Sequence, residues 1–104
     1  MKRVEKAVRE YAGLVRKRLG SHVEQVVLFG SRARGTAQDT SDYDFLLVVD
    51  RRTPDLREAV LDVGVEMLNR YDRLFAALIY TNEEWDEGKH APLGWNIRRE
   101  GIAV

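Results

Sequence analysis

The sequence predicts a small α/β (α+β) protein, in which helices pack against a sheet of about three strands. Apolar residues at helical spacing alternate along the chain with short apolar runs that Gly, Pro and polar residues bound. The predicted order is helix, strand, loop, strand, helix, strand, helix, and interleaved elements of this kind pack in layers. At 104 residues, we expect a single domain over residues 1–104 with one hydrophobic core.

Residues 2–19 have the pattern of an amphipathic helix, and Gly20 follows them as a natural C-terminal stop. An apolar run over residues 23–29 then predicts the first, buried strand. The helical residues expected to face the core are Val4, Ala7, Val8, Tyr11, Leu14, Val15 and Leu19.

The second predicted strand covers residues 42–50 and follows a turn-rich polar loop over residues 35–40. Thr53 and Pro54 have the pattern of an N-cap and a first-turn proline, so a helix begins there and runs to about Asn69. Its expected core residues are Leu56, Ala59, Val60, Val63 and Met67.

The third strand lies within residues 72–80, and its apolar composition predicts a central strand or one packed on both faces. Thr81 and Glu84 form a capping box that starts another helix. Pro92 breaks that helix, and a last short helix ends at Gly101.

Composition excludes several functional classes. The 17 basic and 17 acidic residues give no net charge, whereas proteins that bind long nucleic acids carry a positive excess. The basic excess in residues 1–20 is most simply a solvated helix face. Without cysteine there is no disulfide, thiolate metal site or Cys nucleophile. No secretory signal pattern or membrane-length apolar run occurs, so we expect a cytoplasmic protein.

The chemistry-bearing stretch runs from residue 26 to residue 50. Asp42 and Asp44 begin its second strand, and residues two apart project from the same face of a strand. Two adjacent carboxylates repel each other and are costly to keep ionised without a cation. The pair therefore predicts a site for a hard metal ion, most simply magnesium.

Gly30 and Ser31 predict a phosphate-binding half of the same site. A glycine after a strand lets the backbone approach a ligand closely, and Ser31 is a good N-cap for a short turn with free N–H groups. Arg32 and Arg34 add positive charge. Together with the carboxylate pair, these residues indicate that a nucleoside triphosphate binds here.

Parts of this pattern also occur in unrelated phosphate-binding and metal-binding motifs. The loop lacks the Gly-Lys-Ser/Thr ending of a P-loop, and no G-x-G-x-x-G occurs. Asp-x-Asp is found in phosphatases and glycosyltransferases, where it generally follows a strand instead of preceding one. In the plainest alternative, Asp42 is a turn residue, Asp44 a surface carboxylate and Ser31 only a helix cap.

Gly30-Ser31, ten intervening residues and Asp42-Tyr43-Asp44 resemble the signature of the DNA polymerase beta-like nucleotidyltransferase superfamily. The fuller strings GSRARG and SDYDFLLVVD look like its minimal nucleotidyltransferase (MNT) branch. This resemblance implies a mixed sheet and the transfer of an NMP, with AMP from ATP favoured. It further implies that Asp42 and Asp44 hold Mg²⁺, two ions if the protein is active, and that Gly30, Ser31 and Arg32 contact the nucleotide.

The family pattern also has a third catalytic carboxylate on the third strand, which is not evident in the run Arg73 to Tyr80. Asp72 is the nearest acid. If the strand begins early, Asp72 can approach the pair; if it begins near Leu74, Asp72 is a turn residue at the helix exit, which is the interpretation we favour.

The resemblance implies a partner as well. Minimal nucleotidyltransferases often act beside a small helical HEPN-type toxin, which they restrain as antitoxins, in some cases by adenylylating a tyrosine. We expect such a partner or self-association, with the tryptophan-bearing C-terminal region (Trp85 and Trp95) as the contact surface, and neither a membrane nor a stable nucleic-acid partner. The alternative is a catalytically silent protein of the same fold that binds NTP or neutralises its partner.

Overall fold

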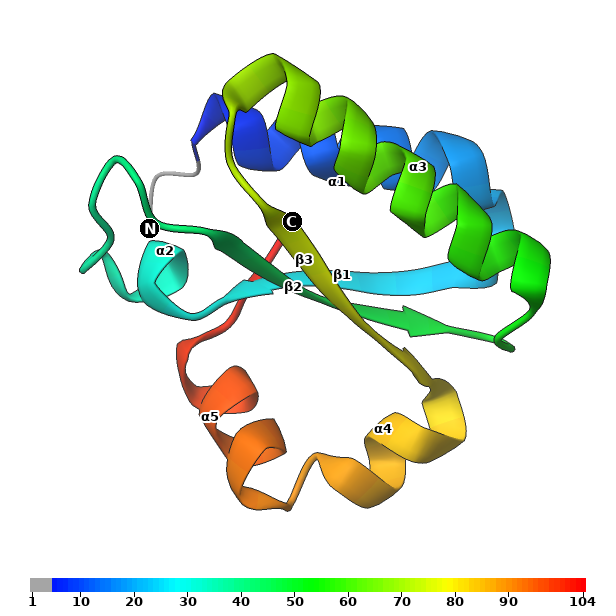
Figure 1. The fold of residues 1–104 in the computed structure, drawn as a ribbon. Helices are drawn as coiled ribbons and strands as arrows, with labels where there is room; N and C mark the ends of the chain where they lie inside the picture. Colours follow the sequence, from blue (N-terminus) through cyan, green and yellow to red (C-terminus); the bar gives the residue numbers. More distant parts are fainter. Residues whose placement is uncertain (1–4) are drawn as a thin grey trace.

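The computed structural model describes residues 5–104 as helices on both faces of a four-stranded sheet (Figure 1). No helix in that range has the length and apolar character needed to cross a membrane. In chain order, the elements are α1 (Lys6–Leu19), the 3₁₀ turn η1 (Gly20–His22), β1 (Val23–Phe29), α2 (Ser31–Arg34), β2 (Tyr43–Val49), α3 (Pro54–Tyr71), β3 (Phe75–Thr81), α4 (Asn82–Gly88), α5 (Pro92–Glu100) and β4 (Ile102–Ala103).

The sheet is mixed, with strand order β3-β2-β1-β4. β1 pairs antiparallel with β2 and with β4, whereas β2 pairs parallel with β3. α1 and α3 lie on one face, and α4 and α5 lie on the other (Figure 1). The expected mixed α/β architecture is confirmed. The fourth strand, β4, was not predicted because two residues are too few to show a periodic pattern.

The third strand lies at an edge of the sheet. β3 begins at Phe75, within the predicted range of residues 72–80, and ends one residue beyond that range at Thr81; of the two predicted placements, the central one does not hold. β3 is nevertheless packed on both faces, because Ala77 and Ile79 face one core cluster while Leu78 and Tyr80 face the other. Two covered faces account for its apolar composition, and an open edge leaves most of its residues only half-buried.

Local signals set the helix starts as the sequence indicated. The Thr53 side chain accepts a hydrogen bond from the Leu56 amide, and Pro54 occupies the first turn of α3. At α4, Thr81 and Glu84 exchange both bonds of a capping box. α3 runs two residues beyond the expected Asn69.

The predicted core faces of α1 and α3 are the observed ones. Leu14 and Ala59 are only partly buried, and Val4 lies outside the described residues. The fully confirmed positions are Ala7, Val8, Tyr11, Val15, Leu19, Leu56, Val60, Val63 and Met67.

β2 supports both layers of the molecule. Its alternate residues Phe45, Leu47 and Val49 face α1 and α3, while Leu46 and Val48 face Trp85 of α4 and Ile97 of α5. On the first face an aromatic stack links the layers: the Phe45 ring lies 4.1 Å from the Tyr11 ring and 6.2 Å from the Phe75 ring, centroid to centroid. β2 is therefore the centre of the fold.

Replacing Phe45 by alanine should lower the free energy of unfolding by about 3–5 kcal/mol, because the fully buried ring leaves a cavity between α1 and β2. Urea denaturation monitored by circular dichroism measures this change. Leu74→Ala is the control, since Leu74 is 53% exposed and its loss should alter stability by no more than about 0.5 kcal/mol. Equal effects of the two changes would contradict the assignment of Phe45 to the core.

Candidate functional site

The pairing of β1 with β2 brings the two halves of the predicted site together. Phe29, the last residue of β1, lies opposite Asp44, the second residue of β2. Gly30 therefore lies directly beside the Asp44 carboxylate. A Cβ atom at residue 30 would lie 2.5 Å from the Asp44 Oδ2 atom, and Gly30 has a φ of 76° that favours glycine. Only glycine allows the backbone and this carboxylate to approach so closely.

The two acids differ in their surroundings. Asp44 is half-buried, whereas Asp42 is exposed and precedes the first residue of β2. Burial raises the pKa of Asp44, and the negative charge of Asp42 raises it further; Arg34 opposes both effects. The folded protein thus disfavours the ionised form of Asp44.

The pair fits a hard cation only in part. Within residues 5–104, no group of three or more His, Cys, Asp or Glu side chains converges on a metal position. Two carboxylates are hard oxygen donors suited to Mg²⁺, which usually keeps several waters and takes further oxygens from substrate phosphates. The two carboxylates alone would therefore need further oxygen donors, from water or a bound phosphate, to complete the coordination of such an ion.

The predicted phosphate-binding loop forms the short helix α2. Its N-cap is Gly30 and not Ser31, whose side chain was expected to cap; the Gly30 carbonyl accepts hydrogen bonds from the amides of Ala33 and Arg34, each at 3.1 Å. Ser31 is instead the first helical residue. Gly35 ends the helix in the left-handed conformation, with a φ of 80°.

Glu100 joins this loop from the other end of the chain. The Gly30 amide donates a hydrogen bond to its Oε1 atom at 3.1 Å, and the Arg34 guanidinium donates to Oε1 at 3.2 Å and to Oε2 at 3.1 Å. The Glu100 side chain is only 12% exposed. Its part in the site was not predicted, since Glu100 ends α5 at no recognisable spacing from the other site residues.

Arg32 was predicted to contact the nucleotide, but its guanidinium donates hydrogen bonds to other residues of the chain. Its Nη2 atom donates to the carbonyls of Asp39 at 3.2 Å and Ser41 at 2.8 Å, and its Nη1 atom lies 3.3 Å from Glu5 Oε1. The guanidinium also lies 4.2 Å from the centre of the Tyr43 ring, and the side chain is 9% exposed. These surroundings favour a structural role.

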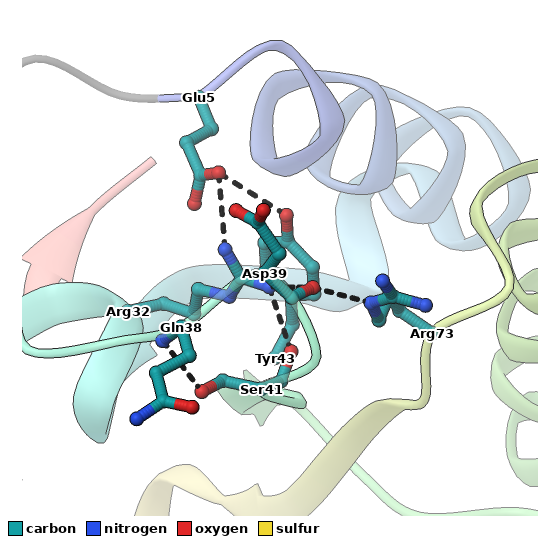
Figure 2. A network of polar contacts seen from close by, with 7 residues as sticks. All are labelled: Glu5, Arg32, Gln38, Asp39, Ser41, Tyr43 and Arg73. Atoms are coloured by element: carbon teal, nitrogen blue, oxygen red, sulfur yellow. Dashed lines mark hydrogen bonds and ion pairs between the residues drawn. The ribbon is translucent and has the colours of Figure 1, made fainter.

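Figure 2 shows what Arg32 holds in place. Arg73 also donates a hydrogen bond to the Asp39 carbonyl, so two arginines hold the loop before β2. Within the loop, the Gln38 amide donates to Ser41 Oγ. Tyr43 donates to Glu5, the residue before α1. The network fixes the backbone that immediately precedes Asp42, so Arg32 acts on the acidic pair through the loop.

The structure places Asp72 outside β3. It caps the C-terminus of α3 with a φ of 53°, its amide donates to the Leu68 carbonyl at 2.8 Å, and its side chain is fully exposed. This is the turn position that we favoured. No residue of β3 is acidic, and Ala76 is the residue in register with Asp44.

Comparison with known proteins identifies the family of this chain. A family model described as "Nucleotidyltransferase domain" matches residues 4–97. A Methanocaldococcus jannaschii protein named "Putative protein adenylyltransferase MJ0604" is 28% identical over 97 residues, covering 93% of each chain.

Solved structures share the fold. A toxin–antitoxin crystal structure with AMP-PNP superposes with a TM-score of 0.63 at 14% identity, over 92% of this chain and 70% of that chain. A Shewanella oneidensis structure, described as a tri-AMPylated HEPN toxin in complex with its MNT antitoxin, gives a TM-score of 0.57 at 11% identity, over 93% and 67%. At these identities the likeness concerns the fold.

Asp44→Asn should become increasingly stabilising relative to wild type as the pH rises from 4 to 7 in metal-free buffer. The pKa of Asp44 is raised above its ordinary value of 3.8, so its contribution to stability is present at low pH and is lost as the pH rises through the folded-state pKa. Asparagine does not titrate and avoids this loss. Urea denaturation at several pH values in EDTA measures the difference.

Asp42→Asn is the matched control for this titration. It removes one of the two causes of the shift and leaves burial, so the pH dependence assigned to Asp44 should shrink without disappearing. A large loss of stability in Asp44→Asn at neutral pH would contradict the interpretation and would identify Asp44 as a structural hydrogen-bond acceptor.

Proposed function

The chain belongs to the nucleotidyltransferase domain family as a minimal nucleotidyltransferase enzyme, and from this premise we propose that it transfers AMP from ATP to a hydroxyl of a partner protein in the cytoplasm. The observation that carries the proposal is the close approach of Gly30 to Asp44. It joins a loop suited to phosphate with an acidic pair suited to Mg²⁺, and a metal-bound triphosphate needs both.

We assign the metal to Asp42 and Asp44, with two ions when the site is active. Such ions would stabilise charge on the attacking and leaving oxygens. The two residues differ in how strongly they would respond to the metal. Asp42 is exposed, whereas Asp44 is half-buried and has a raised pKa, so a bound cation would stabilise the ionised form of Asp44 more than that of Asp42.

Gly30, Ser31 and Arg34 are the proposed contacts of the β- and γ-phosphates. The Gly30 amide and the half-exposed Arg34 side chain lie beside Asp44 and present donors to an anion. Arg32 supports this set by holding the loop that leads to Asp42, so we assign it a positioning role in place of the predicted nucleotide contact.

The residues of the chain orient an in-line displacement. A bond forms between the acceptor hydroxyl oxygen and the α-phosphorus, the bond from the α-phosphorus to the β-bridging oxygen breaks, and pyrophosphate leaves. No acid of β3 is available to take the hydroxyl proton, and Asp72 lies outside that strand. We propose that the partner completes the site and that transfer without it is slow.

The proposed partner is a small helical protein of the HEPN type, which would make this chain the antitoxin half of a toxin–antitoxin pair. The HEPN–MNT complex among the structural neighbours supports this choice of partner, and the name of the Methanocaldococcus relative supports a protein as the acceptor. The proposed contact surface is on α5, where Leu93 and Trp95 are 47% and 51% exposed. Trp85 is buried in the core instead. Self-association through the same surface is the alternative.

The wild-type protein should bind ATP in the presence of Mg²⁺, with affinity that falls when the metal is removed. Titration calorimetry with ATP, GTP, CTP and UTP, with and without EDTA, measures binding and nucleotide preference. A folded protein that binds none of these at millimolar concentration would overturn the assignment of the site.

Labelled AMP should pass from ATP to the cognate HEPN-type partner, and Asp42→Asn should reduce the rate by at least about 100-fold because the metal position loses a charged ligand. Gel autoradiography with α-³²P-ATP measures the transfer. Asp72→Ala is the control, since an exposed helix-capping residue should leave the rate within about twofold. Rapid transfer that Asp72→Ala abolishes would place the third carboxylate at residue 72 after all.

A further inference from the structure

Glu100 places a nearly buried carboxylate at the site. It is 12% exposed, and its contacts are the Gly30 amide, which donates to Oε1, and the Arg34 guanidinium, which donates to both oxygens. A carboxylate so withdrawn from water is stable only when it is paired and hydrogen-bonded. The structure therefore holds a negative group firmly against the phosphate-binding loop.

The donors that hold Glu100 are the same donors that the proposed function gives to the triphosphate. A carboxylate oxygen and a phosphate oxygen are both anionic acceptors that suit a backbone amide and an arginine. Each amide hydrogen serves one strong acceptor, and two anions at this separation repel each other. Glu100 and a phosphate group therefore cannot both accept the Gly30 amide hydrogen, and they compete for the Nη1 atom of Arg34.

We propose that Glu100 is an internal competitor of the nucleotide: it occupies the Gly30 amide and Arg34 in the free protein and is displaced when the triphosphate binds. The inference rests on the proposed function, and it names a determinant of affinity that the sequence pattern did not contain. The exchange replaces one anion by another, so Arg34 is paired in both states.

The position of Glu100 in the fold allows this exchange without unfolding α5. Glu100 is the last residue of the helix, whereas the core contact of α5 is Ile97, which is 1% exposed. The Gly101 amide donates to the Ile97 carbonyl and closes the helix independently of the Glu100 side chain. Arg34 is 49% exposed, so an incoming phosphate can reach it before Glu100 leaves. Moving the Glu100 side chain therefore leaves both of these α5 contacts in place.

Glu100→Gln tests the proposal, because it removes the charge and keeps the shape. Calorimetry with Mg-ATP should give a Kd about three- to tenfold lower than that of the wild type, since a neutral amide oxygen competes less well than a carboxylate for the amide and the guanidinium. An unchanged Kd would show that Glu100 does not compete. A higher Kd would show that Glu100 supports the loop or joins the metal site, and would equally overturn the proposal.

Glu84→Gln is a matched control. The Glu84 carboxylate also accepts a hydrogen bond from a backbone amide, that of Thr81 at 2.9 Å, and pairs with an arginine, Arg52. It lies at the start of α4, on the capping box and not on the phosphate loop. Losing it should alter thermal stability while leaving the Kd for Mg-ATP unchanged. An equal gain of affinity in this variant would assign the effect to loosening of the fold.

The amide resonance of Gly30 provides a second readout that does not depend on affinity. In ¹H–¹⁵N spectra, Glu100→Gln should shift this resonance in the free protein, and saturating Mg-ATP should bring both proteins to a common position. ATP binding that leaves the Gly30 amide unmoved would refute the displacement but not the nucleotide site. If both proteins are folded and neither binds any NTP, the proposed function fails and this inference fails with it.

Discussion

The antiparallel register between β1 and β2 is the constraint on which the rest of this structure depends. It places Phe29 opposite Asp44, and thereby sets the loop that follows β1, the proposed phosphate contact, against the two acidic residues at the start of β2. A slip of one residue would turn every side chain of β2 to the opposite face. Phe45 would then leave the aromatic stack and Asp44 would enter the core. The same hydrophobic burial that fixes the fold therefore fixes the geometry of the site.

Elements with a strong local signal were predictable from the sequence. The core face of α3 and the Thr53 cap follow from helical periodicity and N-cap chemistry, and both were located correctly. The position of β3 at the sheet edge was not predictable, because a strand covered on both faces has the same composition at an edge as at the centre. β4 pairs with β1 over only two residues and has no pattern of its own.

For the site, the sequence contained the types of residue but not their partners. Arg32 and Arg34 are two residues apart with similar neighbours, yet one guanidinium is enclosed by carbonyl groups and Tyr43 while the other is half-exposed beside Asp44. Their difference arises from the path of the loop over residues 38–41, which propensity does not determine. The role of Glu100 was not predictable for a similar reason. Its contact with Gly30 depends on the pairing of β4 with β1, which brings the end of α5 next to the loop after β1.

The fit between Gly30 and Asp44 limits how this site can be modified. Two independent conditions exclude a side chain at residue 30: the backbone conformation with positive φ, and the absence of space in front of the Asp44 carboxylate. If the proposed nucleotide site is correct, variation in nucleotide affinity falls on the neighbours of Gly30 and not on Gly30 itself. Ser31, Arg34 and Glu100 are then the positions at which binding strength can change while the separation between the loop and the acidic pair stays constant.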